Sequence, residues 1–471
     1  MNNLIKNEIT KILKKKVFLV ILIVVFIFII ISNLLNKYAF IAMSKVSDYN
    51  DKYIEYLNEE LKNLNPNNPE QLEMYISDLN ELELCNLQKQ YDYNSWQYTI
   101  VQEKAGTYID NINQIKYKTK DDEELQKAQD EYNKFKEQLN SNDWKKFATE
   151  ELEALEKSKQ ELGEGIKDPS LDLQIEVAKM RLDYNIEYGQ NFKNEALQRY
   201  LSSKNTLLEL EKQNNKTYSN EKEYQDAQEN AEKSKYAIEN DKDIFNQSDA
   251  RGILLDFISN YELFIIITIV FVAGSIVSEE FNKGTIKLLL VRPYSRIKIL
   301  LAKFITVLIT ILFIIAFTII AQFIVGGIVF GFDSLKIPDV IYNHNTGSLI
   351  EISIFKSVIL SALGRLPIYI LIGSLAFALG TLLNNTGIAI TISLLGYMVS
   401  SIINELVYQY NLKNFKFFVT TNWDFTQYYY GNLPTLQGLS MGFSCIICLI
   451  YFAVMIIPTF IVFKKKNIKN V

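Results

Sequence analysis

The sequence predicts an all-α membrane protein with six transmembrane helices and a long α-helical, coiled-coil-like extracytoplasmic domain between the first and second of them. Three observations lead to this fold class. Six apolar runs are long enough to cross a bilayer. The stretch between the first two runs is polar and acidic, and it contains few helix breakers.

The 471 residues fall into two regions of opposite net charge. Residues 37–258 contain 29 Lys and Arg against 45 Asp and Glu, a net charge of −16. The other residues contain 20 basic and nine acidic groups, a net charge of +11, and nearly all the long apolar runs. Three domains follow: a cytoplasmic amphipathic helix with the first transmembrane helix (1–36), the extracytoplasmic helical domain (37–258), and a transmembrane domain with helices two to six (259–471).

Three cysteines and one histidine exclude several kinds of site. Cys85 stands alone in the acidic stretch and offers no disulfide framework. Cys445 and Cys448 have redox or metal spacing, but they lie in an apolar run without a second ligand pair, so ordinary helix packing is favoured. His344 has no Cys or His partners and is interpreted as a loop residue. No catalytic residue, metal site or bound cofactor is expected in this chain.

The transmembrane helices are expected at 17–35, 261–278, about 304–331, about 366–383, 386–404 and 443–463. The first is interpreted as a retained anchor, because its apolar core exceeds that of a signal peptide and no cleavage site follows. Segments 1–16, 279–303 and 464–471 together carry 15 basic residues, against five in the segments of 259–471 that would lie on the other side of the membrane. The positive-inside rule therefore places both termini in the cytoplasm and residues 37–258 outside. The Lys-, Ile- and Asn-rich composition suggests an AT-rich bacterial genome, so a bacterial plasma membrane is expected.

Three further segments are expected at the membrane surface. The N-terminal NLIKNEITKILKKK predicts a basic amphipathic helix on the inner leaflet. An expected break at GRLP would leave 350–364 along the outer interface, with Arg365 as an interfacial anchor or, alternatively, a pathway residue, and Pro367 at the start of the fourth helix. Residues facing lipid there would be Ile352, Phe355, Ile359 and Leu363. The aromatic segment 405–442 is expected to form short interfacial helices.

The acidic stretch shows apolar residues at the 3.5-residue period of paired helices. Turns are expected near 65–69, 118–121, 163–169 and 213–219. A single helix over 171–213 would be about 65 Å long. The seams contain Ala, Tyr, Ser and Asn, which predicts a slender bundle of modest stability, and the acidic excess is interpreted first as a solvated face and second as a site for cations or basic peptides.

The loop between the second and third apolar runs, SEEFNKGTIKLLLVRPYSRIKILLAKF, is charged and contains two breaks. Gly284 is expected to end one helix, and Thr285 to cap a short helix over IKLLLV. Pro293 would stop that helix, and Ser295 would cap the next one, which carries Arg296 and Lys303 into the third span. A short helix attached to two spans can transmit a displacement to both of them. The alternative interpretation of the loop is a structured turn with ordinary positive-inside charges.

This loop resembles the hallmark loop of the ABC type-2 transporter permeases, which follows the second of six spans in that family. The amphipathic N-terminus and the final FKKKNI are also similar, so the resemblance covers 1–36 and 259–471. It implies that the loop 279–300 is a coupling element seated on a nucleotide-binding subunit. The positions that match the motif, with Lys303, are Glu279, Glu280, Phe281, Gly284, Thr285, Leu288, Leu289, Arg292, Pro293, Ser295 and Arg296.

The resemblance implies a dimeric permease subunit, homo- or heterodimeric, that exports a peptide, lipid-like or drug-like substrate. A separate ABC ATPase would bind the ATP and Mg²⁺, because this sequence contains no G-x-x-x-x-G-K-[ST] phosphate loop. The expected partners are therefore the ATPase, a second permease subunit and the lipid bilayer, with no nucleic acid. The alternative is a membrane-anchored coiled-coil surface protein that binds an extracellular partner without transport.

Overall fold

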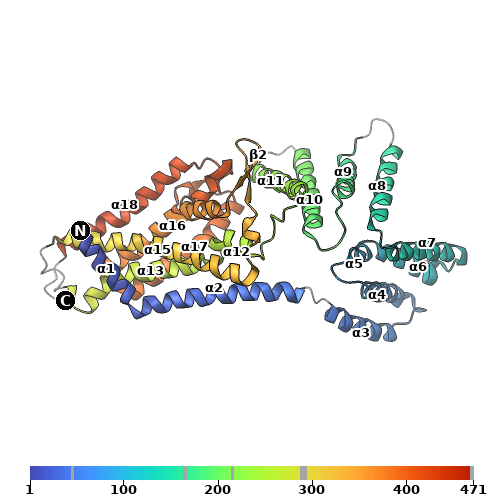
Figure 1. The fold of residues 1–471 in the computed structure, drawn as a ribbon, viewed down its shortest axis with the longest axis horizontal. Coiled ribbons are helices and arrows are strands. Elements are labelled where there is room, and N and C mark those ends of the chain that lie inside the picture. The colour runs from blue at the N-terminus through green and yellow to red at the C-terminus, as the bar shows by residue number, and fades with distance from the viewer. Residues whose placement is uncertain (44–46, 163–166, 214–216, 287–293, 467–471) are drawn as a thin grey trace. The chain divides into compact units, whose positions relative to one another are not determined.

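The computed structural model describes residues 1–43, 47–162, 167–213, 217–286 and 294–466. These residues are overwhelmingly helical and fall into two compact units (Figure 1). Unit 1 comprises Met1–Lys37 and Asn246–Val471, and unit 2 comprises Tyr38–Phe245. The sequence placed the second boundary at 258/259, whereas residues 246–258 lie in unit 1, where α12 (Ala250–Leu255) packs on α15.

Unit 1 contains the membrane-spanning helices. The predicted six are confirmed among the described residues, because six helices are long and apolar enough to cross a bilayer. They are α2 (Lys16–Met43), α13 (Phe257–Asn282), α15 (Arg296–Phe330), α16 (Ile354–Leu383), α17 (Thr386–Gln409) and α18 (Met441–Lys465). The predicted amphipathic helix is present as α1 (Asn2–Lys14), whose face Leu4–Glu8–Ile12 is buried against the bundle.

Helix α13 lies at the centre of unit 1, in contact with α15, α16 and α17 (Figure 1). In its apolar window 72% of the residues are buried, against 17% in α17 and 22% in both α2 and α18. The exposed side chains of those three outer helices are mostly large and apolar. Such a surface is stable only in contact with lipid or with other membrane helices, so this chain is a membrane protein.

The expected break at GRLP is wrong. Helix α16 runs without interruption from Ile354 to Leu383, with Pro367 inside it, and Ile352 is a buried strand residue. Membrane helices tolerate proline because neighbouring groups satisfy the freed backbone. Arg365 also does not need to reach the membrane surface, because Glu262 and Asp424 compensate its charge within the bundle.

An antiparallel hairpin, β1 (Asp339–Asn343) and β2 (Ser348–Ile352), precedes α16 and was not predicted. The aromatic segment after α17 was expected to form short helices, and it forms the 3₁₀ helices η4 (Lys413–Phe417), η5 (Val419–Thr421) and η6 (Phe425–Gly431). A further 3₁₀ turn, η3 (Ser334–Lys336), follows α15. His344 lies in the hairpin loop, and its backbone N–H donates to the Tyr430 carbonyl at 2.8 Å.

Unit 2 consists of helices in its described residues, as predicted: α3 (Ser47–Asn63), α4 (Pro69–Gln88), α5 (Trp96–Ile100), α6 (Gly106–Gln114), α7 (Asp122–Asn140), α8 (Trp144–Glu161), α9 (Pro169–Asp183), α10 (Phe192–Lys212) and α11 (Tyr218–Asn240). The wide π turn η1 (Val101–Ala105) joins α5 and α6 into one continuous helix, and a second π turn, η2 (Ile115–Thr119), extends that helix beyond α6. The hydrophobic core of unit 2 contains aromatic and aliphatic side chains such as Trp96, Phe135 and Phe147.

The expected turns near 65–69 and 118–121 are confirmed, but the expected single helix over 171–213 is wrong. The chain leaves helix after Asp183 and starts α10 at Phe192. The helix ends where Asn185 adopts a left-handed φ of +52°. Gly189 lies in the segment that follows. It has φ +110°, a conformation that favours glycine, and a Cβ there would lie 2.7 Å from the Asn94 carbonyl oxygen. This glycine therefore permits close contact with the segment before α5.

Candidate functional site

The candidate site is the described part of the loop 279–300 together with the helix ends that hold it. Glu279 and Glu280 lie on the last turn of α13, and the chain then turns through Gly284, whose φ of +68° suits glycine. The Thr285 hydroxyl donates to the carboxylate and carbonyl oxygens of Glu280. The short helix that Thr285 was expected to cap lies almost wholly outside the described part of the chain. Of the predicted residues, Leu288, Leu289, Arg292 and Pro293 lie outside the described part of the chain.

Four charged side chains meet at the end of α13. Lys303 of α15 is only 1% exposed, and its Nζ lies 2.7 Å from Glu8 Oε2 and 3.4 Å from Glu280 Oε1. Lys11 Nζ lies 2.9 Å from the same Glu280 oxygen and 3.1 Å from Glu8 Oε1. Lys303 also donates to the Ile276 carbonyl at 3.0 Å. The two carboxylates and two ammonium groups balance, and they join α1, α13 and α15.

A second ion pair attaches the end of α1 to α13. Lys15 Nζ lies 2.9 Å from Glu279 Oε1, and Lys283 Nζ lies 3.2 Å from Glu279 Oε2. Burial acts to lower the pKa of Lys11, but its hydrogen bond to Glu280 and the charges of Glu8 and Glu280 outweigh burial and raise that pKa above its usual value. Lys11 therefore stays charged across the physiological range.

The other end of the loop is held by the C-terminal segment. Ser295 caps α15, as predicted, by accepting from the Lys298 N–H. Arg296 Nη1 donates to the Lys466 carbonyl at 2.7 Å and to the Lys464 carbonyl at 3.3 Å. Lys466 Nζ in turn donates to Thr381 O, Leu382 O and Asn384 Oδ1 at the end of α16, and lies 4.8 Å from the centre of the Phe281 ring. Burial lowers the pKa of Lys466.

Sequence reasoning missed the residues outside the loop that hold it: Glu8, Lys11, Lys15 and Lys466. One signal was available for Glu8. It lies four residues from both Leu4 and Ile12, which places a carboxylate in the middle of the apolar face of α1. Beside this network, residues of α1 and of the end of α13 line an open cavity of about 440 Å³.

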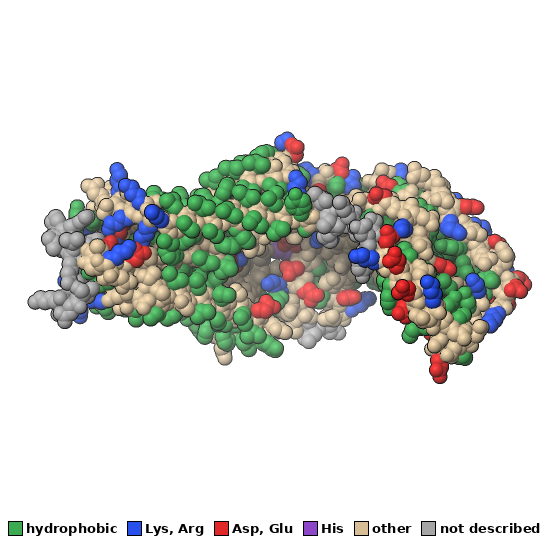
Figure 2. All heavy atoms as spheres, turned by 90° about the horizontal axis from the view of Figure 1, so that it is seen from below, with side chains coloured by type: hydrophobic (Ala, Val, Ile, Leu, Met, Phe, Trp, Pro, Cys, Tyr) green, Lys and Arg blue, Asp and Glu red, His purple; other side chains and the backbone are tan. Residues whose placement is uncertain are grey.

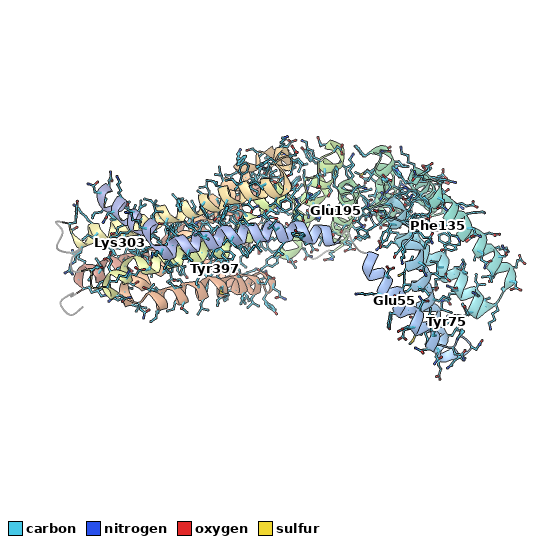
Figure 3. All side chains as sticks on the ribbon, turned by 60° about the horizontal axis from the view of Figure 1, so that its bottom comes forward. Glu55, Tyr75, Phe135, Glu195, Lys303 and Tyr397 are labelled. Carbon is cyan, nitrogen blue, oxygen red and sulfur yellow. The ribbon has the colours of Figure 1, made fainter. Side chains whose placement is uncertain are left out.

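A second cluster of charges lies farther along the bundle, where Figure 3 shows Tyr397 well separated from Lys303. Arg365 Nη1 lies 3.6 Å from Glu262 Oε1, and its Nη2 lies 3.3 Å from Asp424 Oδ2. The Tyr397 hydroxyl donates to Glu262 Oε2 at 2.9 Å. These contacts join α13, α16, α17 and the segment before η6. Intramembrane charges that face a bundle interior are candidates for a substrate pathway, which was the alternative interpretation of Arg365.

A third polar group fixes α2 to the bundle. The Asn33 and Gln322 side-chain amides exchange hydrogen bonds of 2.9 and 3.1 Å, and the Tyr261 hydroxyl donates to Gln322 at 2.7 Å. All three residues are fully buried. Since apolar packing alone is weakly specific between membrane helices, these bonds set the position of α2, which buries little of its own surface.

A family model described as "Protein of unknown function (DUF2705)" matches residues 228–469, just over half of the chain. The chain belongs to the DUF2705 family. Two relatives of this DUF2705 protein come from Bacillus subtilis (strain 168). "Uncharacterized protein YhcI" is 29% identical over 47% of the chain and 72% of its own length. "Uncharacterized membrane protein YdbK" is 28% identical over 42% of the chain and 75% of its own length. No solved structure matches.

Proposed function

We propose that this DUF2705 protein is the permease subunit of an ABC exporter, driven by a separate ATPase through the loop 279–300. The observation that carries the proposal is the attachment of both ends of that loop to four helices. Glu279 and Glu280 pair with lysines of α1 and α15, and Arg296 holds the end of α18. A push on the loop must therefore displace α1, α13, α15 and α18 together.

Such attachment suits a coupling element better than a passive turn. A loop that only connects two spans needs no buried lysine, since exposed charges satisfy the positive-inside rule at lower cost. Lys303 is instead desolvated between two carboxylates that belong to different helices. We propose that it transmits movement of α13 to α15 and to the amphipathic helix α1.

The finer features of the proposal concern arrangement in the membrane. We propose that both termini and the loop face the cytoplasm, and that unit 2 is an extracytoplasmic helical domain that contacts or shields the substrate. The functional unit would be a homo- or heterodimer, and the substrate a peptide, a lipid-like molecule or a drug-like molecule. The bilayer-facing surfaces of α2, α17 and α18 leave apolar area for a second subunit.

The test starts from the genes beside this one: a lone ABC ATPase is expected among them, and it is to be co-purified with this chain before ATP hydrolysis is measured. The chain alone should hydrolyse no ATP, and the complex should hydrolyse it at a rate that depends on the loop. Arg296→Ala, which removes the contact to the α18 end, should uncouple hydrolysis from transport while the chain still inserts. Asp333→Asn is the matched control, because Asp333 is exposed and pairs only locally with Lys336.

Two results would contradict the proposal. ATP hydrolysis by the isolated chain is one. The other is a correctly inserted chain that binds no ATPase, which would favour the alternative of a membrane-anchored surface protein.

A further inference from the structure

Two lysines at the bend between α1 and α2 have a different environment from their neighbours. The backbone is extended at Lys15, so α1 ends at Lys14 and α2 begins at Lys16. Lys11 and Lys15 are paired with Glu280 and Glu279. Lys14 and Lys16 are exposed, and they form no hydrogen bond or ion pair with any residue that the structure describes. Two positive charges without a described partner therefore lie on either side of the bend at Lys15, two residues apart in the chain.

An apolar stripe starts directly beside these charges. Val17, Val20, Val24, Ile27 and Ile31 are each about half exposed, between 47% and 55%. Their spacing of three and four residues places them on one face of α2, and Lys16 lies one turn from Val20 on that same face. The stripe is about 21 Å long at 1.5 Å per residue, which exceeds the roughly 15 Å depth of one leaflet of hydrocarbon.

The position of the lysines relative to the bilayer follows from contacts within unit 1. Helix α1 is attached by Lys11 and Lys15 to the last turn of α13, and it packs on the start of α15. The apolar parts of α2, α13 and α15 therefore all end at the level of Lys14 and Lys16. Figure 2 shows basic side chains gathered at this end of unit 1 and hydrophobic side chains over its middle. Lipid headgroups must lie at this level, whichever leaflet it is.

We propose that Lys14 and Lys16 bind the phosphate of an anionic phospholipid whose acyl chain lies along the stripe Val17–Ile31 of α2. The two ammonium groups attract a headgroup with net negative charge, and they repel the ammonium of a zwitterionic one. A free phosphate ion would use the lysines but not the stripe, so the structure favours lipid as the occupant. Lys14 also lines the 440 Å³ cavity, which leaves room for a headgroup beside the bend. This inference does not rest on the proposed permease function.

The test is a titration of the full-length protein with phosphatidylglycerol or phosphatidylcholine of identical acyl chains, with bound lipid counted by native mass spectrometry. Phosphatidylglycerol should bind more tightly. A surface lysine contributes about 1 kcal/mol to binding an anionic headgroup, which is about fivefold in affinity for each lysine. Lys14→Gln with Lys16→Gln should therefore remove most of the preference, and Lys14→Arg with Lys16→Arg should keep it.

The matched control is Lys356→Gln with Lys413→Gln. It makes the same change in charge at exposed lysines of unit 1 that lie at the start of α16 and beyond the end of α17, and it should leave the preference unchanged. Excess inorganic phosphate should not displace the lipid. Equal affinity for both lipids, an equal loss in the control, or displacement by phosphate would each overturn the proposal.

Discussion

Lys303 is the residue on which the charge network at the end of α13 depends. It is 1% exposed and is the ion-pair partner of both Glu8 and Glu280. Its replacement by Met preserves the volume but leaves Glu8 buried with Lys11 as its remaining partner. Removing one partner from a buried ion pair costs about 3–5 kcal/mol, so we expect Lys303→Met to lower the free energy of unfolding by about 3 kcal/mol. Denaturation in mixed micelles would measure it.

Lys298→Met is the control for this change, because Lys298 is an exposed residue of the same helix, and the expected effect is within about 0.5 kcal/mol. Adding Glu8→Gln to Lys303→Met should restore part of the lost stability, since the second change removes the uncompensated charge. Additive losses in the double variant would show that Glu8 and Lys303 do not interact.

At the scale of single residues, the sequence predicted helix caps and helix ends, because these features depend on residues close by in the chain. Ser295 was recognised as a cap, and Gly284 as a helix end, because capping chemistry acts within four residues. The partner of Lys303 could not be found this way, since Glu8 lies 295 residues earlier in the chain. The compensation of Arg365 by Asp424 depends likewise on how η6 returns to α16, which no local pattern encodes.

Helices α13 and α16 approach each other closely where Gly274 and Gly380 meet. A Cβ on Gly380 would lie 2.4 Å from the Gly274 carbonyl oxygen, so an added methyl group must push the helices apart. We expect Gly380→Ala to lower the free energy of unfolding by about 1–3 kcal/mol, the range for overpacking. Small residues at such crossings let membrane helices approach closely. The measurement is thermal or denaturant unfolding of the purified protein.

Gly396→Ala isolates this packing effect, because Gly396 lies within α17 and a Cβ there would meet no atom within 4 Å. Alanine is the better helix former by up to about 1 kcal/mol, so this control should be neutral or stabilising. Similar losses in both variants would rule out a contact specific to Gly380.

Whole elements were predictable where hydropathy or periodicity is strong, as in the six spans and α1. Errors arose where tertiary contacts override a local preference. The heptad pattern continued through 184–191, yet the helix ends at Asp183, Asn185 adopts a positive φ, and Gly189 packs on Asn94. Conversely, Pro367 suggested a break that α16 does not have, because the bundle around α16 supplies partners for Arg365. The hairpin β1–β2 is too short for its alternation to stand out among apolar neighbours.

At the scale of the whole molecule, charge separates the two units more clearly than any motif does. The stretch 37–258, which contains all of unit 2, carries a net −16, whereas the remaining residues carry a net +11 concentrated in the segments 1–16, 279–303 and 464–471. Acidic residues contribute little to membrane orientation, so a long acidic domain can be translocated while short basic segments stay inside. The charges thus predict one orientation for the complete chain, and the proposed use of the loop depends on it.

Impermeant thiol labelling of intact cells tests this orientation. In a background with Cys85, Cys445 and Cys448 replaced by Ala, Lys134→Cys should be labelled and Lys298→Cys should not. Both side chains are exposed, but Lys134 lies in the acidic stretch 37–258 and Lys298 in the basic segment 279–303. Permeabilised cells should label both, which controls for reactivity. If Lys298→Cys were labelled in sealed cells and Lys134→Cys were not, the orientation would be the opposite of the predicted one. Unit 2 would then be cytoplasmic, and the loop 279–300 could not reach an ATPase, so one experiment would refute both the topology and the coupling role.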